Sequence, residues 1–320
     1  MNTWKMIEAA RQLGARVGLG ALLAAVLGTA AMGTAGCSRD HIEAINLANQ
    51  GDQAVSVNVS GAIAKYEEAS RLDPSNHRIF WKLAMAYQKQ EEWGKMESAL
   101  SRAAAQAPQF ADYFYYRGYA LVRSAEAGAK DAYEDAKQPL QKCIELDPNY
   151  ADCYHWLAQC MLWTGNDQAA LENYTKAIEH DPKTGYFYPP LAELYTNLRF
   201  YDEAEKTLKE GERLLEKVQK NKNALYGIYT LLYNVYQAKG DTASGVAALE
   251  SADQVAGDTH PEIAYNLGSA YAVMNPPKKD QAVRLLKSFN KRACAGAKGA
   301  TTFKEQCETS NALVAKLGGN

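Results

Sequence analysis

The sequence lacks the short motifs that would indicate an enzyme or a metal site. It has no Cys-x-x-Cys pair, no His-Glu-x-x-His run, no Gly-x-Ser-x-Gly elbow, no phosphate-binding loop and no complete dinucleotide fingerprint. Its 5 histidines are scattered, and a lone histidine is more often a contact residue than a metal ligand or a base. We therefore predict that the protein is not an enzyme and holds no cofactor and no metal.

An excess of charge of one sign is also missing. The chain has 35 Lys and Arg against 37 Asp and Glu, a net charge of -2. A nucleic-acid binder needs a basic face against the phosphate backbone, so we expect no nucleic-acid partner. The contents of 47% hydrophobic and 22% charged residues are ordinary for globular proteins and argue against a disordered chain.

Strand patterns and membrane-length apolar runs are absent after residue 40. A transmembrane helix needs about 20 consecutive apolar residues, and no run in this part of the chain approaches that length. The one alternating stretch, Val55–Val59, is too short and too isolated to found a sheet. These absences leave an all-α protein as the expected fold class.

The first 36 residues are predicted to be a signal peptide. Lys5, Arg11 and Arg16 make the start basic, and Val17–Met32 is then apolar apart from three glycines and one threonine. This run is shorter than a membrane span and suits the core of a signal peptide. Four small residues, 33–36, and then Cys37 follow it.

This segment resembles a bacterial lipoprotein signal, in which an aliphatic residue and two small residues precede a lipidated cysteine. Thr34 stands where Leu is usual, and the alternative is an ordinary signal peptide with Cys37 an incidental thiol. The resemblance implies cleavage after residue 36, a lipid on Cys37 and a short tether over residues 37–40. Because Ser38 rather than Asp follows the cysteine, it favours the outer membrane, facing the periplasm.

A helix pair repeats along the rest of the chain. Its second helix carries a small residue, a bulky one four positions on, a small one seven positions on and a proline twelve positions on. The four clearest copies are Ala62-Tyr66-Ala69-Pro74, Met96-Leu100-Ala103-Pro108, Ala136-Leu140-Cys143-Pro148 and Ala170-Tyr174-Ala177-Pro182. Spacings of three and four put these residues on one helical face, and proline ends the helix. Weaker copies follow at Ala204-Leu208-Gly211, Gly245-Leu249-Ala252 and Ala282-Leu286.

The first helix of each unit has its own pattern, in which Leu and a small residue lie between an aromatic residue and a tyrosine. Copies are Phe80-Leu83-Ala84-Tyr87, Tyr154-Leu157-Ala158-Met161, Tyr188-Leu191-Ala192-Tyr195, Tyr229-Leu232-Tyr233-Tyr236 and Ala264-Leu267-Gly268-Tyr271. Over residues 41–290 the chain resembles the tetratricopeptide repeat family, which has a 34-residue period. The resemblance implies a right-handed superhelical solenoid of about seven helix-turn-helix units, with six as the alternative. One domain, residues 41–320, would hold them.

Several irregularities modify this pattern. The third unit has six extra residues around Ala125–Tyr133, and Pro139 is expected to move the start of its second helix towards Gln138. Pro189-Pro190 predicts a late start for the fifth unit's first helix, and that unit's second helix is expected to continue through Val218. A capping box at Thr302 and Glu305 predicts a last helix to Leu317, a C-terminal cap from about residue 301.

The cysteines beyond Cys37 number five, in a chain expected to enter an oxidising compartment. Cys294 and Cys307 flank a Gly/Ala-rich loop and are a possible disulfide between the last repeat and the cap, with two free thiols as the alternative. Cys143 and Cys153 are a second possible pair. Cys153 and Cys160 lie roughly 10.5 Å apart along one helix and cannot pair.

The resemblance also implies a groove lined by the first helices. With the Tyr or Leu of each first helix as its eleventh position, the second, fifth, ninth, twelfth and thirteenth positions face the groove; we call these the groove positions. They are Arg78, Trp81, Met85, Gln88, Lys89, Asp112, Tyr115, Tyr119, Arg123, Asp152, His155, Gln159, Trp163, Tyr186, Glu193 and Asn197. Aromatic residues with mixed charge suit a peptide segment of a partner protein. The alternative is that these aromatic residues are covered by the superhelix itself.

We therefore expect a lipid-anchored, non-catalytic scaffold of the cell envelope that binds a partner protein or peptide in its groove and assists assembly of an envelope complex. Relatives with this anchor-and-repeat layout include pilotins and lipoproteins of the outer-membrane protein assembly machine, and a pilotin-like role is the first hypothesis. The alternative is a regulator of a cell-wall enzyme that acts through the convex face.

Overall fold

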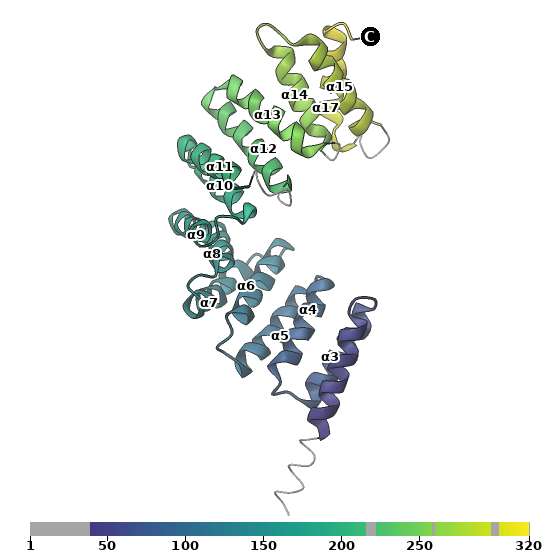
Figure 1. Ribbon diagram of the computed structural model, residues 1–320, viewed down its shortest axis with the longest axis vertical. Coiled ribbons are helices and arrows are strands. Elements are labelled where there is room, and N and C mark those ends of the chain that lie inside the picture. The colour runs from purple at the N-terminus through teal and green to yellow at the C-terminus, as the bar shows by residue number, and fades with distance from the viewer. Residues whose placement is uncertain (1–38, 216–221, 258–259, 296–300, 320) are drawn as a thin grey trace, which may run out of the picture. The chain divides into compact units, whose positions relative to one another are not determined.

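The computed structural model describes residues 39–215, 222–257, 260–295 and 301–319. Cys37 and the predicted signal peptide lie outside these residues, and so does Val218. The described residues form helices and no strand, which confirms the all-α class (Figure 1). Residues 39–54 are helical, and the further helices are α3 (Val59–Leu72), α4 (His77–Lys89), α5 (Trp93–Gln106), α6 (Ala111–Glu126), α7 (Ala132–Leu146), α8 (Ala151–Trp163), α9 (Asp167–His180), η1 (Gly185–Phe187), α10 (Tyr188–Asn197), α11 (Tyr201–Leu215), α12 (Lys222–Lys239), α13 (Thr242–Ala256), α14 (Pro261–Val273), α15 (Lys279–Ala293) and α17 (Lys304–Lys316).

The chain divides into two compact units within α6. Unit one ends at Arg123 and unit two begins at Ser124. In chain order the described helices alternate as first and second helices of seven pairs, which begin at residues 39–54, α4, α6, α8, α10, α12 and α14. Helix α17 follows the last pair and packs on α14 and α15.

The core of unit one consists of the residues that repeat in the sequence. Ala62 and Ala69 of α3 are fully buried, and Tyr66 between them is 2% exposed. They form one cluster with Leu83 of α4 and Leu100 of α5. The small residues let the helices approach, and the tyrosine and leucines fill the space between them, as the pattern predicts.

The core of unit two follows the same rule and depends on two glycines. A Cβ atom at Gly211 would lie 2.8 Å from Cγ of Tyr188. A Cβ atom at Gly268 would lie 2.9 Å from Cγ of Leu286. Real Cβ atoms do not approach so closely, so these small positions are where two helices are in closest contact. Figure 1 shows α12 to α15 side by side, each helix next to the one that follows it.

The turns between repeats use an acidic residue before proline. Oδ1 of Asp73, Asp147 and Asp181 accepts a hydrogen bond from the backbone N–H two residues later, at 3.3, 3.0 and 3.2 Å. The backbone N–H of each aspartate also closes the preceding helix. The following proline prevents the helix from continuing.

Two predicted helix starts are wrong and one is confirmed. Helix α7 begins at Ala132 and contains Pro139. Proline has no N–H to donate to the carbonyl of Asp135, but Asp135 is exposed, so this carbonyl can bond to water. The turns on either side of Pro139 keep the helix continuous. Helix α17 begins at Lys304 after Phe303, with no side-chain cap. The capping box is replaced by packing of Phe303 on Phe289, with ring centroids 5.9 Å apart. The late start at Pro189 is confirmed, since α10 follows the short helix η1.

Two disulfides join helices of unit two. Cys143 of α7 bonds to Cys153 of α8, with Cα atoms 6.3 Å apart. Cys294, at the end of α15, bonds to Cys307 of α17, with Cα atoms 5.9 Å apart. The second bond therefore attaches the last helix to the last repeat. Cys160 is a free, buried thiol.

Candidate functional site

In unit one the groove positions carry an aromatic cluster. Trp81 of α4 lies 5.4 Å from Tyr113 and edge-on to Tyr116 at 5.1 Å, between ring centroids. Tyr115 and Tyr119 of α6 stack at 6.3 Å. All of them except Tyr113 are half-buried, so each holds its neighbours and still offers ring surface to solvent.

The remaining groove positions of unit one frame this cluster. Met85 is half-buried and packs, like Trp81, on the core. Arg78 and Lys89 are exposed near the two ends of α4. The Arg123 guanidinium lies 5.3 Å from the ring centroid of Trp93. The unit thus presents rigid aromatic surface with cations at its edges, which suits a partner segment with apolar and acidic groups.

In unit two His155 differs from the sequence-based expectation. Its side chain is only 5% exposed, and the rings of Trp156, Tyr186 and Phe187 surround it at 4.9 to 5.3 Å. Burial lowers the pKa of His155 to about 3, so the imidazole is neutral at pH 7. His155 is therefore buried and not open on the groove face where the sequence register puts it, because Phe187 of η1 packs against it.

The other groove residues of α8 lie at its surface. Trp163 is 58% exposed and stacks on Tyr133, with centroids 5.2 Å apart and planes 8° from parallel. Nζ of Lys130 lies 4.8 Å from the Trp163 centroid. Gln159 is half-buried and donates from Nε2 to Oε1 of Glu126 at 2.9 Å. Trp163 is therefore a large aromatic surface held in place by a ring beneath it.

Two acidic groove positions of unit two, the half-buried Asp152 and the exposed Glu193, have raised pKa values. Burial raises the pKa of Asp152, and the neighbouring charge of Asp181 raises it further. Burial also raises the pKa of Glu193. A cationic group brought beside either carboxylate would oppose these shifts, so both positions favour a basic side chain on a ligand.

A cavity of about 690 Å³ opens beside Tyr186. Its wall from η1 and α10 carries Tyr186, Pro189 and Pro190, and its wall from α12 carries Ala224 and Gly227. The rim is polar, with Lys183, Thr184 and Asn223. Tyr186 is 45% exposed, and no atom lies within 4 Å of where a Gly227 Cβ would be. The cavity is therefore apolar at its base and open to a side chain from outside.

The cavity lies at groove positions that sequence reasoning reached only in part. Tyr186 is the second and Pro189 the fifth position of one first helix, and Gly227 is the second position of the next. From the sequence we predict only a helix start at the prolines and give groove positions no further than α10. Continuing the register from Tyr236 would have placed Gly227 on this face, so the signal was present.

Comparison with known proteins agrees with this geometry. Residues 58–91 match the family model described as TPR repeat, and residues 129–186 match the one described as tetratricopeptide repeat. The chain carries tetratricopeptide repeats. No curated protein sequence matches it.

Solved structures that resemble the chain are TPR proteins or share this fold. The C-terminal part of a TPR repeat-containing protein from Cytophaga hutchinsonii is 14% identical, with a TM-score of 0.59 over 79% of this chain and 98% of that one. The MamA protein is 25% identical, with a TM-score of 0.50 over 56% of this chain and 94% of that one. PilW, described as a widely conserved type IV pilus biogenesis factor, is 16% identical, with a TM-score of 0.51 over 66% and 92%.

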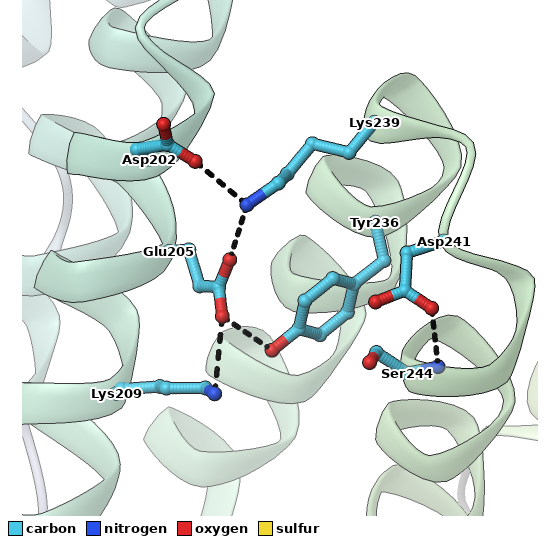
Figure 2. Close-up of polar contacts among 7 residues, drawn as sticks. All are labelled: Asp202, Glu205, Lys209, Tyr236, Lys239, Asp241 and Ser244. Carbon is cyan, nitrogen blue, oxygen red and sulfur yellow. Dashed lines mark hydrogen bonds and ion pairs between the residues drawn. The ribbon is translucent and has the colours of Figure 1, made fainter.

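The TPR helices of unit two also hold a dense polar network, shown in Figure 2. Nζ of Lys239 lies 2.7 Å from Oδ1 of Asp202 and 2.6 Å from Oε2 of Glu205. Oε1 of Glu205 accepts from the hydroxyl of Tyr236 at 3.0 Å and lies 3.0 Å from Nζ of Lys209. These contacts, with that of Lys239 foremost, lower the pKa of Glu205 to about 2. The network joins α11 to α12, and the carboxylate of Glu205 accepts from three donors.

Groups with catalytic chemistry are scarce in the described part of the chain. It holds no group of three or more His, Cys, Asp or Glu side chains that could bind a metal ion. Burial raises the pKa of Cys160 to about 12, so this thiol is protonated at neutral pH. None of the described helices is long and apolar enough to cross a membrane. The TPR fold is typically a non-catalytic scaffold for protein–protein interaction.

Proposed function

We propose that the protein is a scaffold that binds a segment of a partner protein at the groove positions of its TPR units. The observation that carries the proposal is the cavity of about 690 Å³ between η1, α10 and α12. Its walls include groove positions of two successive repeats, both within unit two. Ligand sites are typically concave and largely apolar, with a few polar groups at the rim, and this cavity has that composition.

The groove chemistry favours a partner segment with aromatic or aliphatic anchors. Trp81, Tyr115 and Tyr119 in unit one, and Trp163 and Tyr186 in unit two, are partly exposed rings held by neighbouring rings. Rigid aromatic groups lose little entropy on binding and often contribute much of the energy of an interface. A peptide that places apolar side chains against the rings of either unit would gain from those contacts.

The location we propose is the cell envelope, with Cys37 lipidated and the repeats facing the periplasm from the outer membrane. The apolar run at residues 17–32 and the small residues before Cys37 support it, and two disulfides in unit two fit an oxidising compartment. The role we propose is pilotin-like assistance in assembling an envelope complex. It rests on the anchor-and-repeat layout, because the similarity to PilW is one of fold.

Substitution of exposed groove rings tests the binding surface. We expect the double variant Trp163→Ala and Tyr186→Ala, and separately Trp81→Ala with Tyr119→Ala, to lose capture of the envelope protein that co-purifies with the wild type. A matched control, Lys142→Ala with Glu145→Ala on the second-helix face of α7, should retain it. Circular dichroism would check that each variant is folded. If both groove variants still captured the partner and the control variant did not, the binding site would lie on the second-helix face and not in the groove.

Substitution of Cys37 tests the anchor separately. We expect Cys37→Ser to move the protein from the membrane fraction to the soluble periplasmic fraction. A Cys160→Ser variant is the matched control, because its thiol is buried in α8 and should leave fractionation unchanged. Membrane association that survives Cys37→Ser would rule out lipid anchoring at this residue.

A further inference from the structure

At several places among the described residues, a furrow lies on the second-helix face where two successive second helices flank the first helix between them. In unit one, α3 and α5 form its walls and Phe80, Leu83 and Tyr87 of α4 form its floor, with a volume of about 330 Å³. In unit two, α9 and α11 flank Tyr188, Leu191 and Tyr195 of α10, with about 280 Å³. Both floors are made of the repeated core residues.

The walls of these two furrows carry opposite charges at three equivalent positions. Each also holds one charge of the other sign, Glu67 in the first, which accepts a hydrogen bond from the Tyr87 hydroxyl, and Lys206 in the second. Arg71 follows Tyr66 by five residues, and Glu179 follows Tyr174 by five. Lys95 precedes Leu100 by five residues, as Glu203 precedes Leu208. Arg102 follows Leu100 by two residues, as Glu210 follows Leu208. We call the unit-one site, with Arg71, Lys95 and Arg102, the basic furrow, and the unit-two site, with Glu179, Glu203 and Glu210, the acidic furrow.

Several of these charges have no partner within the described residues. Neither Arg71 nor Arg102 forms a hydrogen bond or ion pair there, although the guanidinium of Arg102 lies 4.1 Å from the Phe80 ring centroid. Lys95 is paired with Glu92 at 2.5 Å. Arg102 is thus fixed over an aromatic floor with its N–H edge available to an acceptor.

The acidic furrow shows the same availability. Glu179 and Glu203 form no hydrogen bond or ion pair among the described side chains, and Glu210 pairs with Arg213 of its own helix at 2.6 Å. The fold itself does not demand such charges, because the furrow between α13 and α15 carries Glu250, Asp253 and Arg284. The furrow between α11 and α13 likewise carries one charge of each sign, Lys209 and Glu212. The predominance of one sign is therefore a property of the basic and acidic furrows.

We propose that the basic furrow of one molecule binds the acidic furrow of a second copy of the same chain. The wall charges of the two furrows have the same spacing, because they lie at equivalent positions of equivalent second helices. The α5 ridge of one copy can therefore enter the acidic furrow while the α9 ridge of the other enters the basic furrow. Lys95 and Arg102 then face Glu179, and the apolar floors lose contact with water.

Charge reversal in two differently tagged full-length chains tests this pairing in detergent micelles at low salt. Variant A is Arg71→Glu with Arg102→Glu, and variant B is Glu179→Arg with Glu210→Arg. We expect each variant to lose at least tenfold in co-capture of its own kind, because like charges then meet. A mixture of A with B, which restores opposite charges, should recover wild-type co-capture.

The control is Lys142→Glu with Glu145→Lys on α7, which lies outside both furrows, keeps the net charge and should associate as the wild type does. Raising salt from about 0.05 M to about 0.5 M should weaken wild-type co-capture, since exposed charges are screened. No self-association of the wild type at low salt, or loss in both variants without recovery in the mixture, would overturn the proposal. The groove variants of Trp81 and Tyr119 should still self-associate, so failure of this proposal is separable from failure of the proposed function.

Discussion

The α3–α5 region of unit one and the α9–α11 region of unit two have the same core and opposite charges at three positions of their furrow walls. Tyr66 corresponds to Tyr174 and Leu100 to Leu208, and all four are at most 2% exposed. Five residues beyond the tyrosines, Arg71 corresponds to Glu179. The shared residues are those that the helix contacts require, and the differing ones line the furrows. The comparison teaches that repeat geometry fixes the core positions and leaves the wall positions free to select a partner.

The largest expected effect comes from substitutions in the core that the two regions share. Leu100→Ala and Leu208→Ala each remove a fully buried side chain at the same position of the repeat. We expect each to lower the free energy of unfolding by about 2–5 kcal/mol, from lost burial and the cavity left behind. Chemical denaturation measures both. A cost below about 1 kcal/mol for either leucine would mean that the two regions do not share one packing rule.

A smaller effect is expected at the close helix contact of unit two. Gly211→Ala places a Cβ atom 2.8 Å from Cγ of Tyr188 and 2.9 Å from Cδ1 of Ile228, so we expect a loss of about 1–3 kcal/mol. Gly227→Ala in α12 is the matched control. It has open space around it and should raise stability by up to about 1 kcal/mol. Equal effects of the two substitutions, measured by thermal unfolding, would contradict the close-contact account.

The network of Figure 2 predicts an acid-sensitive joint in unit two. The pKa of Glu205 is lowered from 4.5 to about 2, so its stabilisation is present above about pH 4.5 and is lost as the pH falls towards 2. We expect Glu205→Gln to cost about 1–2 kcal/mol at pH 7 and less at pH 3. Denaturation of both proteins at the two pH values measures this. A cost that does not change with pH would show that the carboxylate charge contributes nothing to the joint.

The smallest effect sharpens the difference between the two surfaces. Arg102→Glu and Glu210→Lys exchange exposed charges on the furrow walls, and we expect each to change the free energy of unfolding by less than about 0.5 kcal/mol. Chemical denaturation at moderate salt gives the value. A loss comparable to that of Leu100→Ala would mean that the walls are part of the fold and not free to vary.

The sequence was sufficient to predict the helices wherever one local rule decides. Spacings of three and four identified the buried residues, and Pro74, Pro148 and Pro182 marked helix ends, because these features act within one or two turns. The helix starts predicted from Pro139 and from Thr302 were wrong for the opposite reason. Contacts made far along the chain outweigh the local preference there, as Phe303 shows by packing on Phe289.

The sequence predicted which residues of each first helix face the groove, but not which of them are exposed and which are covered. The groove positions indicated Tyr186 and Trp163, which are exposed, but could not show that Phe187 covers His155. The cavity depends on Gly185, whose Cβ would lie 2.6 Å from that of Ala224, so η1 and α12 touch there. A contact between segments nearly 40 residues apart has no signature in either segment alone.

The most direct test of the scaffold function is photo-crosslinking in intact cells from a reactive residue at Tyr119, with mass spectrometry of the product. A probe at Glu145, on the second-helix face of α7, is the matched control. The account predicts one dominant envelope protein captured at Tyr119, lost when Trp81→Ala is added, and absent from the Glu145 probe. Capture of that protein at Glu145 and not at Tyr119 would contradict the groove as the binding site.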